Sequence, residues 1–417
     1  MQRRRMLRGG TLAASLLVPV AGGRGQAPGQ SAGQPPAPAP PAGLPDGAEP
    51  LDPILQPFLA SHGLPALAAA VVRAGRIVAA GAVGTRRAGA EIPVTLDDRF
   101  HIGSDTKAMT ALLAAIEVEA GRLRWDGTVA ESFPEMAAGM AAGLGAVTLA
   151  QLLSHSSGLP ADDAAFIELI GRSFTVDGYL NLDELRLWLV REWSGRPLAS
   201  APGTRFAYAN MNYVIAGAMI ERAAGRTWEE LIVERVFGPL DLRTAGLGPQ
   251  SSMGRVDAPL GHAVRPDGTL KPMLAGPDGD GPAIIGPAGV VHLSVLDFAR
   301  WAGWNAGEGR RGPALVRPET LRLLHTRRID MPPRPGAAPG TPDGGGAYAL
   351  GWGWGRFAFS PDLFLTHNGS NTMNLAMIAL RPERDFGMVL VTNLGDTRAD
   401  AALRAAAAAL YGRFGAG

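Results

Sequence analysis

The 417-residue sequence contains no cysteine and almost no lysine. Without cysteine the chain cannot have a disulfide framework, a cysteine nucleophile or a thiolate metal site. Among its 39 basic residues only Lys107 and Lys271 are lysines, and the other 37 are arginines. Because the chain uses arginine at nearly every basic position, a position that has a lysine is a candidate for a role that requires an amine.

An excess of charge of one sign is also missing. The formal net charge is +1, which argues against a protein that holds nucleic acid by bulk electrostatics. Four arginines within residues 3–8 precede an apolar stretch at 11–20 that is too short to span a bilayer. Residues 1–25 therefore predict an export signal that resembles a twin-arginine signal, with an ordinary secretory signal or an uncleaved anchor as alternatives. Its removal leaves 34 basic and 38 acidic residues, a net charge of −4, in a periplasmic or secreted chain with no membrane span.

Residues 26–50 consist mainly of Pro, Ala, Gly and Gln, which predicts an extended, disordered linker. The single G-x-S-x-G match of the chain, at residues 29–33, lies in this segment. That nucleophile motif requires a strand before it and a helix after it, and a proline-rich linker provides neither. The match therefore does not support an α/β-hydrolase.

From residue 51 onward, strand signals lie at both ends of the chain and helical signals lie between them. Two β-capable runs at 67–72 and 76–83 predict a hairpin. Helical patterns occur at 51–59, 109–119, 147–153, 182–193, 214–224, 228–236, 295–306 and 396–411. Later strands are expected at 347–354, 364–367, 374–380 and 388–392.

These signals predict an α+β fold with an antiparallel β-sheet flanked by helices and an inserted all-α domain. The sheet part comprises residues 51–100 and 286–417, and the helical part comprises residues 101–285, with loops over 245–288. The Gly/Asp-rich segment 276–281 has some likeness to a calcium loop but lacks the downstream glutamate, so we expect no metal there.

The first motif with chemical potential is Ser104-x-x-Lys107, at the start of a strong helical pattern. Residues three apart on a helix lie on the same face. A serine needs a neighbouring base to become a nucleophile, and a lysine of lowered pKa can be that base, whereas an arginine cannot. The alternative is a surface lysine that follows a helix-capping serine.

Two further motifs follow along the chain. Tyr208 and Asn210 precede a helical pattern, where a phenol can relay a proton and an amide can bind a substrate. The alternative is a core aromatic with an N-cap asparagine. His367, Gly369 and Ser370 follow a predicted strand, where the glycine allows a ligand to approach closely and backbone N–H groups can form an oxyanion hole. The alternative is a strand that ends in a turn.

The order of these three motifs resembles the serine β-lactamase and penicillin-binding-protein superfamily, in particular the branch of class C β-lactamases, related esterases and D-aminopeptidases. Accessory segments at 152–158, 287–290 and 348–352 also resemble segments of that family. The resemblance covers residues 51 to 410. It implies the β-lactamase/transpeptidase-like fold and a catalytic region over residues 51–417 that needs neither a metal nor an organic cofactor.

The resemblance also implies roles for the residues of the three motifs. Ser104 would be the acylated nucleophile, and Lys107 and Tyr208 would share the acid–base work. Asn210 would contact the substrate. The N–H groups of Ser104 and Ser370 would form the oxyanion hole, in a substrate-binding segment that also includes His367 and Gly369.

The third motif departs from the family pattern, because His367-Asn368-Gly369 stands where β-lactamases and D-Ala-D-Ala peptidases usually have Lys-Thr-Gly. A histidine is mostly uncharged at neutral pH, so it attracts a substrate carboxylate less strongly than a lysine. We therefore expect an ester, amide or D-amino acyl substrate. The alternatives are a β-lactamase or D-Ala-D-Ala carboxypeptidase, and a non-hydrolytic penicillin-receptor or cell-wall-binding module.

Three other side chains have open roles. His155 follows a helical pattern and is expected to be structural. Trp352 and Trp354 can either line an acyl pocket or fill the sheet.

Overall fold

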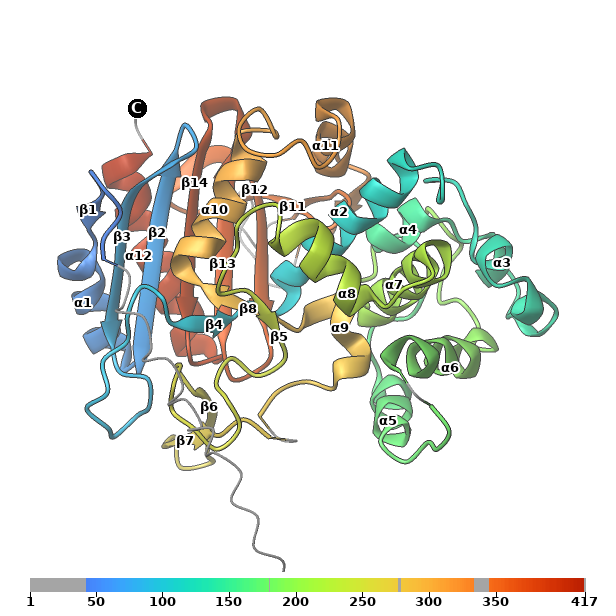
Figure 1. Ribbon diagram of the computed structural model, residues 1–417, viewed down its shortest axis with the longest axis horizontal. Helices are drawn as coiled ribbons and strands as arrows, with labels where there is room; N and C mark the ends of the chain where they lie inside the picture. Colours follow the sequence, from blue (N-terminus) through green and yellow to red (C-terminus); the bar gives the residue numbers. More distant parts are fainter. Residues whose placement is uncertain (1–42, 180, 277–278, 334–344, 416–417) are drawn as a thin grey trace, which may run out of the picture. The chain divides into compact units, whose positions relative to one another are not determined.

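A long β-sheet organises the protein. The computed structural model describes residues 43–179, 181–276, 279–333 and 345–415, so the predicted export signal and most of the predicted linker lie outside it. Within these residues nine strands form one sheet, in which β1 runs parallel to β3 and all other neighbours are antiparallel (Figure 1). In spatial order the strands are β1 (Glu49–Pro50), β3 (Arg76–Gly84), β2 (Ala66–Arg73), β14 (Phe386–Thr392), β13 (Leu375–Arg381), β12 (Ser360–Ser370), β11 (Gly353–Phe357), β10 (Gly346–Tyr348) and β9 (Ile329–Met331).

The two ends of the described chain meet in the middle of this sheet. The predicted hairpin is confirmed by the pairing of β2 with β3, and β14 pairs with β2 on its other side, from Phe386 opposite Arg73 to Thr392 opposite Leu67. The predicted antiparallel sheet built from N-terminal and C-terminal segments is therefore confirmed. Glu49 and Pro50 already pair with β3, so the sheet includes residues just before the boundary predicted at residue 51.

Helices cover both faces of the sheet, which explains why β2 is buried along almost its whole length. Residues 67, 69 and 71 belong to a core with α1 and α12, whereas residues 66, 68, 70 and 72 belong to the core on the α10 side. This alternation follows from the two-residue period of a strand. In Figure 1, α10 crosses the near face of the sheet.

Most of the remaining helices form the predicted helical part of the chain. The helices of the described residues are α1 (Asp52–His62), α2 (Thr106–Glu119), α3 (Val129–Ser132), α4 (Leu149–Leu153), α5 (Ala164–Ser173), α6 (Leu182–Ser194), α7 (Asn210–Ala224), α8 (Trp228–Ile232), α9 (Gly286–Gly289), α10 (Val295–Ala306), α11 (Pro318–His325) and α12 (Thr397–Phe414). The sequence patterns predicted α10 with its observed bounds and missed α3, α5, α9 and α11. Helix α2 is buried along most of its length and contacts α7, α9 and α11.

Two predictions of local structure were wrong. The single strand expected over 347–354 is two strands, β10 and β11, because Gly351 turns the chain with a φ of +80°, a conformation that favours glycine. The region expected as loops over 245–288 contains three short strands, β5 (Gly246–Leu247), β6 (Gly261–Val264) and β7 (Leu270–Met273). Strand β5 pairs with β8 (Val291–Ser294), which also pairs with β4 (Arg99–His101), and β6 pairs with β7.

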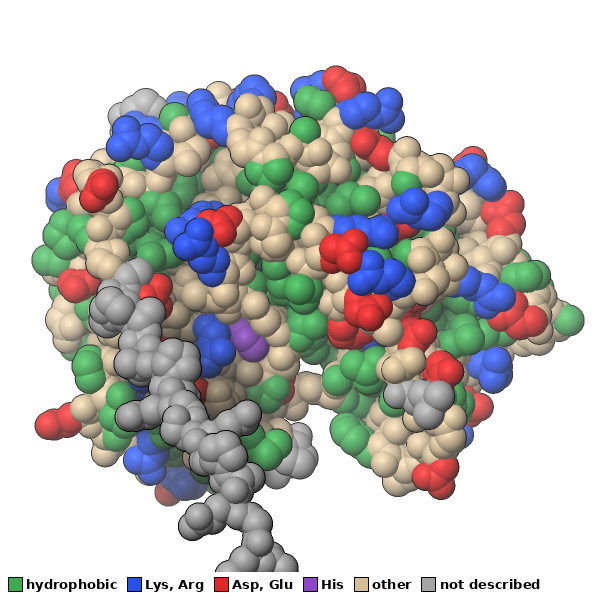
Figure 2. Space-filling model, viewed as in Figure 1, with side chains coloured by type: hydrophobic (Ala, Val, Ile, Leu, Met, Phe, Trp, Pro, Cys, Tyr) green, Lys and Arg blue, Asp and Glu red, His purple; other side chains and the backbone are tan. Residues whose placement is uncertain are grey.

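Basic and acidic side chains are interspersed over the face of the molecule seen in Figure 2.

In the described part of the chain, every helix is too short or too polar to cross a membrane.

Candidate active site

The three motifs, which are far apart in the sequence, meet where the sheet adjoins the helical part. Strand β4 leads into a short 3-10 turn, Gly103–Asp105, and α2 begins directly after it, so Ser104 stands just before the helix. Asn210 is the first residue of α7, and Ser370 is the last residue of β12. Ser104 and Ser370 line both of the cavities described below.

Lys107 is fully buried and points at the proposed nucleophile. Its Nζ lies 3.0 Å from Ser104 Oγ, 2.7 Å from Asn210 Oδ1 and 2.7 Å from the carbonyl oxygen of Ala288. Burial lowers the pKa of the Lys107 ammonium to about 7, against the raising effects of the Asp162 and Asp105 carboxyls. Near neutral pH a large share of this amine is therefore uncharged.

The partners of Lys107 suit a neutral amine. An uncharged amine has two N–H donors and one lone pair. The oxygens of Asn210 and Ala288 can only accept, so they take the two donors. The lone pair is then left for the Ser104 hydroxyl, which is the arrangement that a general base requires.

Asn210 occupies the site in a way the sequence did not indicate. Its Oδ1 accepts from Lys107, while its Nδ2 and backbone N–H donate to the Asp162 carboxylate at 2.6 and 2.8 Å. Both ends of the amide are therefore bound within the protein, although the residue lines a cavity beside Ser104. Its predicted contact with substrate stays a prediction, and the observed role is to hold Lys107.

Tyr208 lies on the other side of the lysine. The Nζ of Lys107 is 4.8 Å from the centre of the Tyr208 ring. Burial raises the pKa of the phenol above its usual value, and a hydrogen bond with the Ser104 side chain lowers it by less. Tyr208 is therefore a neutral phenol next to Ser104, suited to donating a proton rather than to removing one.

The ring of His155 packs against the ring of Tyr208, which fits the structural role expected for His155. The two rings lie 4.2 Å apart between centres. The Nδ1 of His155 is 3.1 Å from Asn212 Nδ2, and burial together with the charge of Lys107 keeps the pKa of this imidazole well below its usual value. His155 is thus a neutral ring that fixes the position of the tyrosine.

At the third motif, two backbone segments touch. A Cβ on Gly369 would lie 1.8 Å from the carbonyl oxygen of Ile102 and 2.6 Å from the Ser104 nitrogen, and a Cβ on Gly103 would lie 2.3 Å from the Ser370 nitrogen. The approach of a ligand at Gly369 stays a prediction, and the space that a side chain would occupy there is taken by the turn that carries Ser104. The contact places the backbone nitrogens of Ser104 and Ser370 next to each other's turn, and their joint role as an oxyanion hole stays a prediction.

His367 is held as a neutral ring. Its Nδ1 lies 2.9 Å from the carbonyl oxygen of Asn368, so the ring proton is on Nδ1, and Nε2 accepts from the Tyr348 hydroxyl at 2.8 Å. Burial, assisted by the charge of Lys107, lowers the pKa of His367 to about 3. The histidine that replaces the family's lysine therefore carries no charge at any physiological pH.

Two cavities flank Ser104. The first, of about 500 Å³, has polar groups at Asp280, Asn371 and Ser370. The second, of about 690 Å³, has a wall of Phe206, Tyr208 and Tyr348 and reaches His367. Among the residues that the structure describes, no arginine or lysine lines either cavity.

The sequence analysis missed two residues of the site and left two others open. Asp162 lies on a loop with no motif around it, and Tyr348 was noticed only as part of an accessory segment. Trp352 is buried against Trp301 with ring centres 6.3 Å apart, and Trp354 donates to the carbonyl oxygen of His325. Neither tryptophan lines the two cavities, so both serve packing. In the described ranges, no cluster of three His, Asp or Glu side chains is arranged to hold a metal ion.

Comparison with known proteins gives one family. A family model described as Beta-lactamase matches residues 51–413. Penicillin-binding protein 4 of Amycolatopsis lactamdurans is 27% identical over 321 residues, which cover 75% of this chain and 77% of that protein.

Two solved structures are similar in fold. The octameric penicillin-binding protein homologue from Pyrococcus abyssi is superimposed with a TM-score of 0.69 and 25% identity, over 87% of this chain and 77% of that one. A D-stereospecific amidohydrolase from Streptomyces sp. gives a TM-score of 0.64 and 20% identity, over 88% of this chain and 99% of that one.

Proposed function

This chain belongs to the Beta-lactamase family, and we propose that it is a serine hydrolase that cleaves neutral esters or amides through an acyl-enzyme on Ser104. The observation that carries this proposal is the contact of 3.0 Å between Ser104 Oγ and the amine of the buried Lys107. The pKa of about 7 lets that amine act as a base near neutral pH.

In the proposed acylation, Ser104 Oγ forms a bond to the substrate carbonyl carbon while its proton passes to the Lys107 amine. The carbonyl oxygen becomes an oxyanion, which the N–H groups of Ser104 and Ser370 stabilise. As the tetrahedral intermediate collapses, the bond to the leaving alcohol or amine breaks, and Tyr208 gives that group its proton. Lys107 returns its proton to Tyr208, and water then hydrolyses the acyl-serine to regenerate Ser104.

The preference for uncharged substrates rests on the electrostatics of the cavities. His367 is neutral, with both ring nitrogens bound within the protein. Among the described lining residues the charged side chain is the acid Asp280, whose pKa lies below its usual value because hydrogen bonds from His101, Asn371 and Gly281 outweigh the raising effect of burial. Among the described lining residues no lysine or arginine is placed to receive a substrate carboxylate.

A substrate panel tests the proposal. One preparation is assayed with p-nitrophenyl acetate, p-nitrophenyl butyrate, D-alanyl p-nitroanilide and the cephalosporin nitrocefin, with Ser104→Ala as the control. We expect turnover of the esters or the anilide with a kcat/KM at least about 100-fold above that of nitrocefin, and none in the control.

The other outcomes of this panel contradict the proposal in different ways. Nitrocefin turned over as fast as the esters would indicate a β-lactamase or D-Ala-D-Ala carboxypeptidase. Acylation of Ser104 without release of product would indicate a non-hydrolytic penicillin receptor. Ester turnover that survives Ser104→Ala would place the nucleophile elsewhere.

We also propose that the protein is exported, on the basis of the basic and apolar pattern of residues 1–25. Mass spectrometry of the N-terminus of the protein purified from its producing cell tests this. An N-terminus beyond the apolar stretch supports cleavage of a signal, and an intact Met1 in the cytoplasmic fraction contradicts export.

A further inference from the structure

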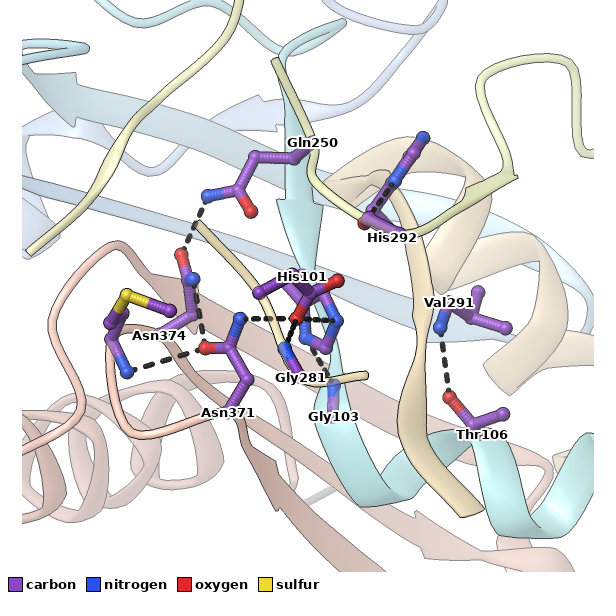
Figure 3. Close-up of polar contacts among 12 residues, drawn as sticks. His101, Gly103, Thr106, Gln250, Gly281, Val291, His292, Asn371 and Asn374 are labelled. Carbon is purple, nitrogen blue, oxygen red and sulfur yellow. Dashed lines mark hydrogen bonds and ion pairs between the residues drawn. The ribbon is translucent and has the colours of Figure 1, made fainter. Parts of the chain in front are cut away.

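A second polar cluster lies behind the expected oxyanion hole and contains no residue of the three motifs. It is centred on His101, the last residue of β4, and Asp280, on the loop before α9. Both side chains are almost completely buried. Figure 3 shows His101 next to Gly103 and Gly281, with Asn371 beyond them.

The contacts of His101 indicate which of its two ring nitrogens carries the proton. The backbone N–H of Gly103 donates to His101 Nδ1 at 3.0 Å, so this nitrogen carries a lone pair and no proton. The ring proton of the neutral imidazole is therefore on Nε2, which lies 3.1 Å from Asp280 Oδ1. His101 thus connects the turn before Ser104 to the carboxylate.

Asp280 continues the connection to the other side of the site. Its Oδ1 accepts from Asn371 Nδ2 at 2.9 Å and from the Gly281 N–H at 2.7 Å. Asn371 Oδ1 in turn accepts from Asn374 Nδ2 at 3.0 Å, and the Ser370 hydroxyl donates to the Asn374 carbonyl oxygen at 2.6 Å. The turn that follows Ser370 is therefore held by the same carboxylate.

These contacts form a continuous path from Gly103 through His101 and Asp280 to Asn371. Gly103 precedes Ser104 and Asn371 follows Ser370, so the path joins the immediate neighbours of the two expected oxyanion donors. The backbones of the two segments also touch directly at Gly103 and Gly369. A shift of either end would change the spacing of the two N–H groups.

We propose that the His101–Asp280 pair is a positioning device that sets the spacing between the Ser104 and Ser370 N–H groups. This inference rests on the proposed function, because it assigns the pair to the oxyanion hole of that reaction. His101 is absent from the lining of both cavities, so it acts on the reaction through the backbone of Gly103 and not by touching substrate.

The test compares variants in the rate at which a fluorophosphonate labels Ser104. In this reaction the Ser104 Oγ–P bond forms, the P–F bond breaks and fluoride leaves, and the serine proton passes to the Lys107 amine. The phosphoryl oxygen takes the place of the oxyanion. We expect His101→Phe and Asp280→Ala to label about 10- to 100-fold more slowly than the wild type, because a misplaced donor loses most of its effect. The double variant should be no slower than about the slower single variant, because the two residues belong to one path.

Two matched variants separate positioning from general damage. Asp280→Asn keeps an oxygen that can accept from Asn371 and Gly281, so it should label faster than Asp280→Ala. His292→Phe removes the buried histidine that stands opposite His101 in β8 and contacts the Gly248 carbonyl oxygen. It should lower the melting temperature without slowing the labelling of the folded protein.

Each result decides the matter. The proposal is overturned if His101→Phe labels at the wild-type rate. It is also overturned if Asp280→Asn labels as slowly as Asp280→Ala, which would mean that the charge of Asp280 acts on the substrate directly. If His101→Phe does not fold, the two Asp280 variants still give the answer. A wild type that labels at Ser104 but hydrolyses no ester or amide would contradict the proposed function alone.

Discussion

Lys107 Nζ lies 3.0 Å from Ser104 Oγ, and the whole lysine side chain is buried. In a chain with 37 arginines and two lysines, this is a position where the two residue types are not interchangeable. An arginine would remain charged, would need more space, and would have no lone pair for the serine proton.

We therefore expect Lys107→Arg to lower kcat/KM for the best substrate of the panel by at least about 1,000-fold. The matched control is Lys271→Arg, which changes the other lysine of the chain at an exposed position in β7 and should leave kcat/KM unchanged. Circular dichroism checks that both variants are folded. Activity of a folded Lys107→Arg near the wild-type level would refute the neutral-base mechanism.

The pKa of about 7 for Lys107 gives the sign of the pH dependence. Below this pH the amine is protonated and cannot accept the serine proton, so kcat/KM should fall about tenfold per pH unit. Above it the amine is neutral and kcat/KM should reach a plateau. His367, with its pKa of about 3, should add no further limb between about pH 5 and 8. If kcat/KM instead begins to fall only below about pH 5, a group other than Lys107 is the base.

Gly369 gives a test of the close contact between β12 and the turn before α2. A Cβ at this position would lie 1.8 Å from the Ile102 carbonyl oxygen, and backbone atoms cannot give way as a flexible side chain can. Gly369→Ala should therefore lower the free energy of unfolding by at least about 2 kcal/mol and slow Ser104 labelling at least about 100-fold.

Gly355→Ala is the matched control for that variant. Gly355 lies in the neighbouring strand β11, and an added Cβ there meets no atom within 4 Å among the described residues. Both its stability and its labelling rate should stay close to the wild type. If urea unfolding and labelling show the two alanine variants to be alike, the Gly369 contact does not shape the site.

The site residues that the sequence identified are those that stand at the ends of regular elements. Ser104 and Lys107 come at the start of α2, and the Tyr208 motif comes at the start of α7, where helical periodicity begins. Those boundaries leave a pattern in the sequence, and the order of the motifs adds the family resemblance. The strong local signals thus located the proposed nucleophile and its proposed base.

The supporting residues could not be predicted in this way, because each depends on a partner distant in the sequence. Asp162 binds Asn210 from a loop 48 residues earlier, and Tyr348 binds His367 across 19 residues. Only the folded chain brings these side chains together. One missed helix, α5, did have a local signal. Asp163 caps this helix by accepting from the Phe166 N–H. An aspartate at this position could have been recognised in the sequence as the start of a helix.

A buried histidine that lines neither cavity should make the stability depend on pH. Burial alone lowers the pKa of His325 to about 3, and its Nε2 lies 3.3 Å from Asn305 Oδ1. In the unfolded chain a histidine titrates near its ordinary pKa of about 6.5. Between these two values the unfolded state binds a proton that the folded state refuses, so stability rises with pH and is lost as the pH falls.

His325→Gln should remove this share of the acid sensitivity, since glutamine keeps a donor for Asn305 and has no proton to gain. The free energy of unfolding, measured with urea at pH 6.5 and 4.5, should fall by about 2–3 kcal/mol less in the variant than in the wild type. The test compares the change in the free energy of unfolding between the two pH values. The stability at a single pH is less informative, because the substitution itself changes packing against Trp352. Equal losses in both proteins would mean that His325 becomes protonated within the folded state, which requires water to reach a ring that is 6% exposed.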